Sequence, residues 1–237
     1  MYNNLIEKIH IELTNRCNAS CPSCPRTGSK KGNIAEHMVN SGWHDISLAD
    51  IKRLCANPAL KNLKKVHLCG NFGDPAVAPD FFEIVKYFAD NDILVSISTN
   101  GHPHTPEKWA SLAHENVRVD WHIDGDENTN HIYRVGTNFH RIIENAKAFI
   151  AAGGKAVWVL IPFAHNEHII KKCETLANDI GFRKFRIKRS YRTFNNGKKL
   201  NNIQLPTNPD LINPIATDRQ DKEIVCKGQK DNEIYLA

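Results

Sequence analysis

Three cysteines lie close together near the start of the chain. Cys17, Cys21 and Cys24 occur in the stretch Arg-Cys-Asn-Ala-Ser-Cys-Pro-Ser-Cys-Pro at residues 16–25. The spacing C-x-x-x-C-x-x-C supplies three sulfur ligands from one short loop, and thiolates select zinc or an iron–sulfur cluster. Three ligands on a four-iron cluster would leave one iron without a protein ligand. We therefore predict a metal site at which an exogenous molecule can bind and be activated.

The other four cysteines do not indicate disulfide bonds. Cys55, Cys69, Cys173 and Cys226 are scattered, and the total of seven is odd. This usage is typical of a reducing compartment. No stretch approaches the ~20 apolar residues of a membrane span, and the first residues lack a signal-peptide pattern. We therefore expect a cytoplasmic protein with no membrane partner.

The 237 residues include 41% hydrophobic residues, enough to bury a sizeable core. The net charge of +5 is too mild to indicate a nucleic-acid partner unless the basic residues are concentrated. Part of the excess of basic residues is concentrated in the C-terminal third of the chain, where it forms either a binding surface or a solvated rim. These residues are Arg183, Lys184, Arg186, Lys188, Arg189, Arg192, Lys198 and Lys199.

Short β-rich runs alternate with helical runs along the chain, which predicts parallel βαβ units. Ser47, Thr105 and Asn138 are candidate helix caps, and Gly181 ends the last helix. The six expected strands are Ile9–Thr14, Lys65–Cys69, Leu94–Asn100, Arg118–Asp124, Ala156–Pro162 and Lys184–Ser190.

These strands alternate apolar and polar residues instead of being apolar throughout. In the first strand, for example, Ile9 and Ile11 oppose His10 and Glu12. Apolar faces under helices leave the polar faces pointing into the lumen of a curved sheet, and a polar lumen implies an occupant. We predict an α/β fold with a partial (β/α)6 TIM-like barrel of parallel strands and a short C-terminal extension. An antiparallel sheet with one solvated face is the alternative.

The cysteines follow the first strand directly, at the mouth where barrel active sites lie. A strand followed by C-x-x-x-C-x-x-C resembles the radical S-adenosylmethionine (SAM) superfamily. The resemblance implies that Cys17, Cys21 and Cys24 hold a 4Fe-4S cluster whose unique iron binds SAM. It further implies that an electron, from a donor such as flavodoxin or ferredoxin, cleaves SAM to a 5′-deoxyadenosyl radical that abstracts hydrogen from the substrate.

Four further motifs resemble that family in the same order along the chain. Gly-Asn-Phe-Gly-Asp-Pro at residues 70–75 is similar to the Gly-Gly-Glu-Pro segment that meets the SAM amino group. Ser-Thr-Asn-Gly at 98–101 and His-Ile-Asp-Gly at 122–125 are similar to Thr-Asn-Gly and Ser-Leu-Asp-Gly segments, with a histidine in the serine place. Tyr-Arg-Val-Gly at 133–136 resembles a segment of the peptide-modifying branch. The resemblance thus implies SAM contacts from Gly73, Asp74, Ser98, Asn100, His122, Asp124 and Arg134.

The Cys-Pro-Ser-Cys-Pro-Arg version of the cysteine motif resembles a branch that often carries a C-terminal SPASM or twitch domain with an auxiliary cluster. We expect residues 1–195 to form the core barrel and residues 196–237 to resemble the entrance of such a domain. Cys226 alone cannot hold a cluster, which usually takes about four thiolates. We favour a minimal member with one cluster over a second cluster completed by ligands from elsewhere.

Three functions remain open from the sequence. The leading one is radical modification of a peptide or protein side chain. A second is radical chemistry on a small anionic substrate such as a nucleotide, motivated by the lumen-facing Arg186 and Lys188. A third is a zinc-binding interaction module in which His37 joins the three cysteines. Cys69 shares the lumen-facing side with His67, either in a substrate pocket or as an inert thiol. No side chain is assigned as a catalytic acid or base.

Overall fold

The computed structural model describes residues 6–27, 35–190 and 203–213, together with short strands at 194–195, 198–199 and 233–236. The side chains of residues 36 and 37 lie outside this set, and so does Cys226. Within the described residues, no helix is long and apolar enough to cross a membrane.

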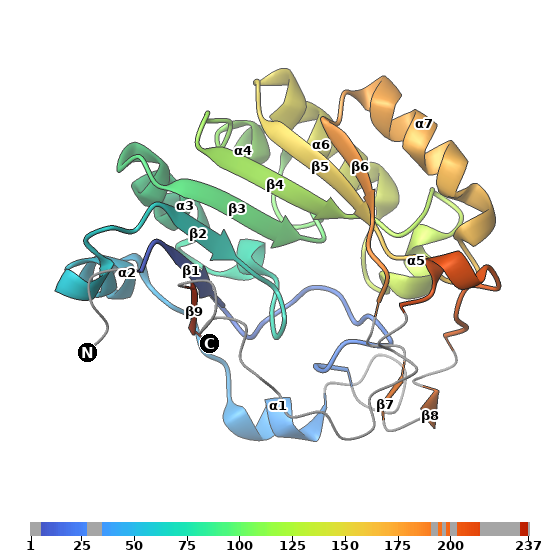
Figure 1. Ribbon diagram of the computed structural model, residues 1–237, viewed down its shortest axis with the longest axis horizontal. Helices are drawn as coiled ribbons and strands as arrows, with labels where there is room; N and C mark the ends of the chain where they lie inside the picture. The colour runs from blue at the N-terminus through green and yellow to red at the C-terminus, as the bar shows by residue number, and fades with distance from the viewer. Residues whose placement is uncertain are drawn as a thin grey trace.

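The core of the fold is an open sheet of parallel strands (Figure 1). The six strands expected from the sequence are confirmed, and all neighbours among them pair in parallel. Among the described strands the sheet does not close on itself, because its order runs β6-β5-β4-β3-β2-β1-β9 with two ends. The strands are β1 Lys8–Ile11, β2 Lys65–Leu68, β3 Leu94–Thr99, β4 Val117–His122, β5 Lys155–Leu160, β6 Lys184–Ile187 and β9 Glu233–Leu236.

Helices between successive strands cover one face of this sheet, as βαβ connections require (Figure 1). The opposite, concave face is left for the loops that follow the strands. The helices are α1 Glu36–Ser41, α2 Leu48–Cys55, α3 Phe81–Asp90, α4 Pro106–Ala110, α5 Asn130–Tyr133, α6 Phe139–Ala151 and α7 Ile170–Ile180. Short 3-10 turns occur at Pro58–Leu60, Pro75–Val77, Glu167–Ile169 and Pro209–Leu211.

The helix boundaries follow the capping residues of the sequence. Ser47 forms a capping box with Asp50 at the start of α2, and the Asn138 side chain accepts from the backbone at the start of α6. Gly181 ends α7 in the left-handed conformation at φ 97°. Thr105 precedes α4 as expected, but its side chain makes no capping hydrogen bond.

The predicted division of the sheet into an apolar and a polar face is confirmed for most strands. Ile9, Ile11 and Val66 are fully buried in the core between sheet and helices. His67 and His122 belong to the other face and line a pocket. Strand β5 is the exception, because Val157 and Val159 occupy its lumen-facing positions. Apolar side chains therefore fill one segment of the lumen wall.

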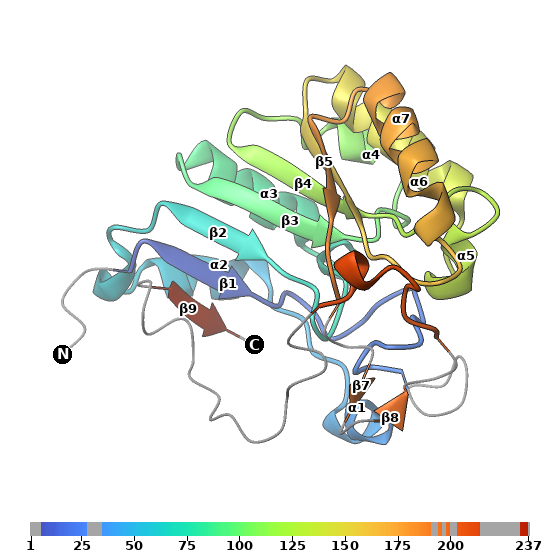
Figure 2. The ribbon, with the colours of Figure 1, turned by 45° about the vertical axis from the view of Figure 1, so that its right-hand side comes forward.

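A seventh parallel strand joins the sheet from the far end of the chain. In β9, Glu233 is in register with Lys8, and Leu236 with Ile11, so β9 lies beside β1 (Figure 2). Strands β7 Phe194–Asn195 and β8 Lys198–Lys199 form a separate antiparallel pair. The expected boundary at residue 195 falls within this pair and stays a prediction.

Candidate functional site

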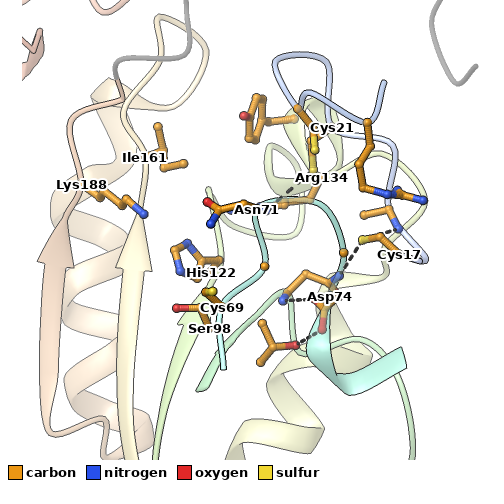
Figure 3. Close-up of a pocket in the computed structure, with 18 of the residues that line it drawn as sticks. Cys17, Cys21, Cys69, Asn71, Asp74, Ser98, His122, Arg134, Ile161 and Lys188 are labelled. Carbon is orange, nitrogen blue, oxygen red and sulfur yellow. Dashed lines mark hydrogen bonds between the residues drawn. The ribbon is translucent and has the colours of Figure 1, made fainter. Parts of the chain in front are cut away.

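The loop between β1 and α1 carries the three cysteines to the C-terminal mouth of the strands. Cys17, Cys21 and Cys24 all line one pocket, which holds about 1040 Å³ of empty space including the part open to solvent. Two backbone hydrogen bonds hold this loop in place: Cys24 N–H donates to the carbonyl of Cys21, and Ser20 N–H donates to that of Val135. The spacing of the motif thus brings three thiols to one cavity, and Figure 3 shows Cys17 and Cys21 on its wall.

The chemistry of these thiols suits a soft metal centre. Burial, with Asp74 nearby, raises the pKa of Cys17 to about 12, and burial also raises the pKa of Cys21. A buried thiolate therefore needs a positive partner, and a metal supplies one. Hydrogen-bond donors already surround the sulfurs: Ala19 N lies 3.3 Å from Cys17 Sγ, and Arg134 Nη1 lies 3.7 Å from Cys21 Sγ.

Three thiolate donors in one loop are a ligand set that suits an iron–sulfur cluster. Among the described residues, no group of three or more His, Cys, Asp or Glu side chains is placed to hold one metal ion. Structural zinc needs about four ligands converging on one point, whereas an iron–sulfur cluster is larger and is held by thiolates around it. The three thiols on one pocket wall are donors of the type that such a cluster takes. The side chain of His37, the zinc alternative's fourth ligand, lies outside the described residues.

Asp74 and Gly73 sit beside the cysteine loop. The Asp74 carboxylate accepts hydrogen bonds from Thr99 Oγ1 at 2.8 Å, Asn100 N at 2.7 Å and Ala76 N at 3.0 Å. Burial raises the pKa of Asp74, and these donors oppose the rise. A Cβ on Gly73 would fall 1.9 Å from the carbonyl oxygen of Thr14. Glycine at position 73 is therefore required by the close approach of the chain to itself.

The ends of β3 and β4 contribute Ser98, Asn100 and His122 to the same pocket. Asn100 Nδ2 lies 3.8 Å from Cys17 Sγ and donates to Asn18 Oδ1 at 2.9 Å. Burial lowers the pKa of His122 well below its ordinary value, and the charges of Arg134, Lys188 and Arg186 add to the effect. Burial thus favours the neutral form of the His122 imidazole.

Arg134 lines the pocket, but Asp124 lies behind it. Arg134 Nε donates to Asp124 Oδ2 at 2.6 Å, and the Asp124 side chain is fully buried. The other oxygen of Asp124 accepts from Ile161 N at 2.6 Å. Burial raises the pKa of Asp124, and Arg134 opposes that rise. Asp124 thus positions Arg134, whose guanidinium is the group that faces the cavity (Figure 3).

Three buried polar residues of the site were not predicted as site residues. Glu12 accepts from the backbone N–H groups of Asn71 and Phe72, and so holds the loop after β2. Arg26 lines the pocket. Asn166, fully buried, donates to the carbonyls of Asp124 and Ile161. Glu12 lies on the polar side of its strand, which is a signal in the sequence, whereas nothing in the sequence distinguishes Asn166 from other loop asparagines.

The opposite wall of the pocket comes from β2, β5 and β6. Cys69 and Ile161 lie on this wall, and the chain after β6 adds Lys188, Arg189 and Ser190. In Figure 3, Lys188 and Ile161 lie across the cavity from Cys17 and Cys21. Apart from the cysteines, Asp74 is the one acidic residue on the described pocket wall, so basic side chains outnumber acidic ones there.

Comparison with known proteins agrees with this geometry. The family model described as the radical SAM superfamily matches residues 11–177. Mycofactocin maturase MftC of Mycobacterium tuberculosis is 28% identical over 173 residues, which cover 72% of this chain and 41% of the maturase. A 7,8-dihydro-6-hydroxymethylpterin dimethyltransferase of Methanocaldococcus jannaschii is 33% identical over 100 residues, covering 39% of this chain and 17% of that enzyme.

Among solved structures, Streptococcus suis SuiB bound to S-adenosylmethionine superposes with a TM-score of 0.66 at 17% identity, covering 97% of this chain and 50% of SuiB. SuiB bound to its precursor peptide SuiA gives a TM-score of 0.59 at 16% identity, covering 76% of this chain and 38% of SuiB. These likenesses show a shared fold. The chain spans half or less of the length of each of these relatives.

Proposed function

The chain belongs to the radical SAM superfamily, and we propose that it cleaves SAM reductively at a 4Fe-4S cluster held by Cys17, Cys21 and Cys24. One observation carries the proposal: the three thiols share a single pocket with Asp74, Asn100 and Arg134. When bound, the cluster and SAM supply a 5′-deoxyadenosyl radical that abstracts a hydrogen atom from the substrate. Family membership makes the chain an enzyme, and the reaction it carries out is the proposed part.

The residues of the pocket have distinct tasks in this proposal. Asp74 has about four lone-pair sites, of which three take donors from the chain, so one remains for the SAM ammonium group. Arg134, held by Asp124, has further N–H donors for the SAM carboxylate. The rest of the wall around SAM is formed by Gly73, Ser98, Asn100 and His122. An external electron donor, such as a flavodoxin or ferredoxin, supplies the electron.

The substrate we propose is a peptide or protein side chain. SuiB has been solved bound to a precursor peptide, and this chain shares its fold. Among the described strands the sheet does not close on itself, so an extended chain could reach the pocket along the edge of the sheet. A small anionic substrate such as a nucleotide is the second candidate, supported by Lys188 and Arg189 on the wall opposite the cysteines.

The proposal is tested with full-length protein reconstituted anaerobically with iron and sulfide. The protein is incubated with SAM and dithionite, and 5′-deoxyadenosine is measured with no substrate, with a pool of peptides, and with a pool of nucleotides. We expect cleavage in the absence of substrate and faster cleavage with peptides. Faster cleavage with nucleotides alone would instead identify the second candidate, and zinc uptake without cleavage would refute both.

A further inference from the structure

Strand β6 forms one end of the sheet. Its inner edge pairs with β5, where Lys184 is in register with Val157 and Arg186 with Val159. In the part of the chain that the structure describes, no strand pairs with its outer edge (Figure 1). Such an edge presents unpaired backbone N–H and C=O groups, which can accept an added strand.

Two basic side chains lie on one face of β6, and a third follows directly after the strand. Side chains alternate along a strand, and Phe185 packs on Trp158 on the helix-covered side, with ring centroids 6.1 Å apart. Lys184 and Arg186 therefore face the lumen, and Lys188, the first residue after β6, lies on the pocket wall of the same side. All three are exposed. We call these three residues the basic stripe.

The basic stripe leads into the pocket. Lys188 lies on the pocket wall, across from the cysteine loop (Figure 3). Arg186, one step further from the mouth, reaches Asp120 with Nη2 2.8 Å from Oδ2. No Asp or Glu occurs in the sequence between Asp179 and Asp210. This segment of the chain therefore brings three cations to the open side of the lumen and no acidic residue of its own, although Arg186 is already paired with Asp120 of β4.

The open edge of β6 and the basic stripe beside it together fit a specific kind of partner. An exposed basic run by itself is usually solvated, but here the cations have the two-residue spacing of a strand and lie along an open edge. On an added strand, side chains at alternate positions would stand about 5 Å from those of β6. Acidic side chains at these positions would oppose the basic stripe, while the backbone pairs with the edge.

We propose that the outer edge of β6 binds an extended acidic segment of the peptide substrate by strand addition. Acidic residues at alternate positions face Lys184, Arg186 and Lys188, and the following residues of the peptide enter the pocket. This inference rests on the proposed peptide substrate. It adds where the peptide binds and which sequence pattern it carries.

The test measures binding of fluorescein-labelled octapeptides to the full chain by fluorescence anisotropy at low salt. The probes are alternating Glu-Thr, its isomer with the repeat Glu-Glu-Thr-Thr, alternating Gln-Thr, and alternating Glu-Thr with every second amide N-methylated. We expect the first probe to bind about tenfold more tightly than each of the others. Equal binding of the isomer or of the N-methylated peptide would overturn strand addition.

Variants assign the binding to the basic stripe. Lys184→Glu combined with Lys188→Glu should weaken binding of the alternating Glu-Thr peptide at least about tenfold. The control is Lys61→Glu with Lys147→Glu, which changes the net charge equally at two exposed positions elsewhere. Equal losses in both double variants would contradict the proposal.

Two further measurements complete the test. The first uses an eight-residue oligothymidine. If it binds more tightly than the acidic peptide, and the stripe variant loses this binding, the partner of the edge is a nucleic acid and the peptide proposal is wrong. Formation of 5′-deoxyadenosine without substrate is measured on the same preparations. Cleavage without peptide binding would refute this inference alone, whereas peptide binding without cleavage would refute the proposed reaction and support the stripe as a binding surface.

Discussion

Arg134 and Asp124 form a buried ion pair at the centre of the site, with Nε 2.6 Å from Oδ2. The fully buried carboxylate has no contact with solvent, and the guanidinium is 13% exposed. The same guanidinium lies 3.7 Å from Cys21 Sγ. This pair joins the loop after β4 to the cysteine loop, so its removal should affect both the stability of the fold and the shape of the pocket.

Asp124→Asn should destabilise the apoprotein by about 3 to 5 kcal/mol, because it leaves the Arg134 charge buried and unpaired. Urea unfolding measures the change. Asp90→Asn is the matched control, since Asp90 pairs with Lys86 on the surface of α3 and exposed pairs contribute less than about 1 kcal/mol. A loss below about 1 kcal/mol for Asp124→Asn would show that the ion pair does not hold the site together.

Gly73→Ala should disrupt the cysteine loop. Its new Cβ would lie 1.9 Å from the Thr14 carbonyl oxygen, so the backbone must move. Gly153→Ala is the comparison, because a Cβ there meets nothing within 4 Å and costs only the strain of φ +90°, about 1 to 2 kcal/mol. Gly73 lacks this strain, because its φ lies outside the left-handed region. We expect a greater loss of stability, and reduced iron uptake, for Gly73→Ala. Equal losses with full iron uptake would contradict the close approach.

His67 should make the apoprotein less stable as the pH drops from 7 to 5. Burial, together with His10, lowers the pKa of His67 to about 4 from an ordinary value of 6.5. The unfolded chain therefore takes up a proton in this range and the folded chain does not, so the folded state loses at most about 2 kcal/mol.

The measurement for His67 is urea unfolding at pH 7, 6 and 5, compared with His67→Gln. The variant lacks this proton uptake, so its stability should change less over the same range. Identical pH dependence in the two proteins would show that His67 titrates in the folded state as it does in the unfolded one.

Anaerobic reconstitution should load about four irons per chain, because three cysteines in one loop hold one four-iron cluster. Iron and acid-labile sulfide analysis measures this. A reproducible eight irons per chain would show a second cluster and would revise the expectation of a single one. Cys226, the candidate ligand for a second cluster, lies outside the described residues.

Much of this architecture could be predicted from local patterns. The alternation in Ile9-His-Ile-Glu12 indicated which side of β1 faces the lumen, and the order of strands and helices predicted a parallel sheet. The strands were expected to extend further at their C-terminal ends than they do. For example, β4 ends at His122, two residues before the predicted end. The reason is that Asp124 leaves the ladder to hold Arg134.

Other features depend on contacts between distant parts of the chain. Pairing of β9 with β1 brings Glu233 beside Lys8, and no local pattern specifies this partner. Asn166 joins the loops after β4 and β5 through two backbone carbonyls. Its role becomes visible only when both loops are placed, because an asparagine in a loop is ordinarily solvated. Long-range polar contacts are therefore the part of the site that sequence reasoning missed.

Formation of 5′-deoxyadenosine by the anaerobically reconstituted full chain tests the central assignment most directly. With SAM and dithionite, the wild type should produce 5′-deoxyadenosine, and Cys21→Ala should produce none and lose its iron. Cys55→Ala, at a half-buried thiol on α2 away from the pocket, should behave as wild type. Cleavage that persists in Cys21→Ala, or an iron-loaded wild type that produces no 5′-deoxyadenosine, would contradict the account.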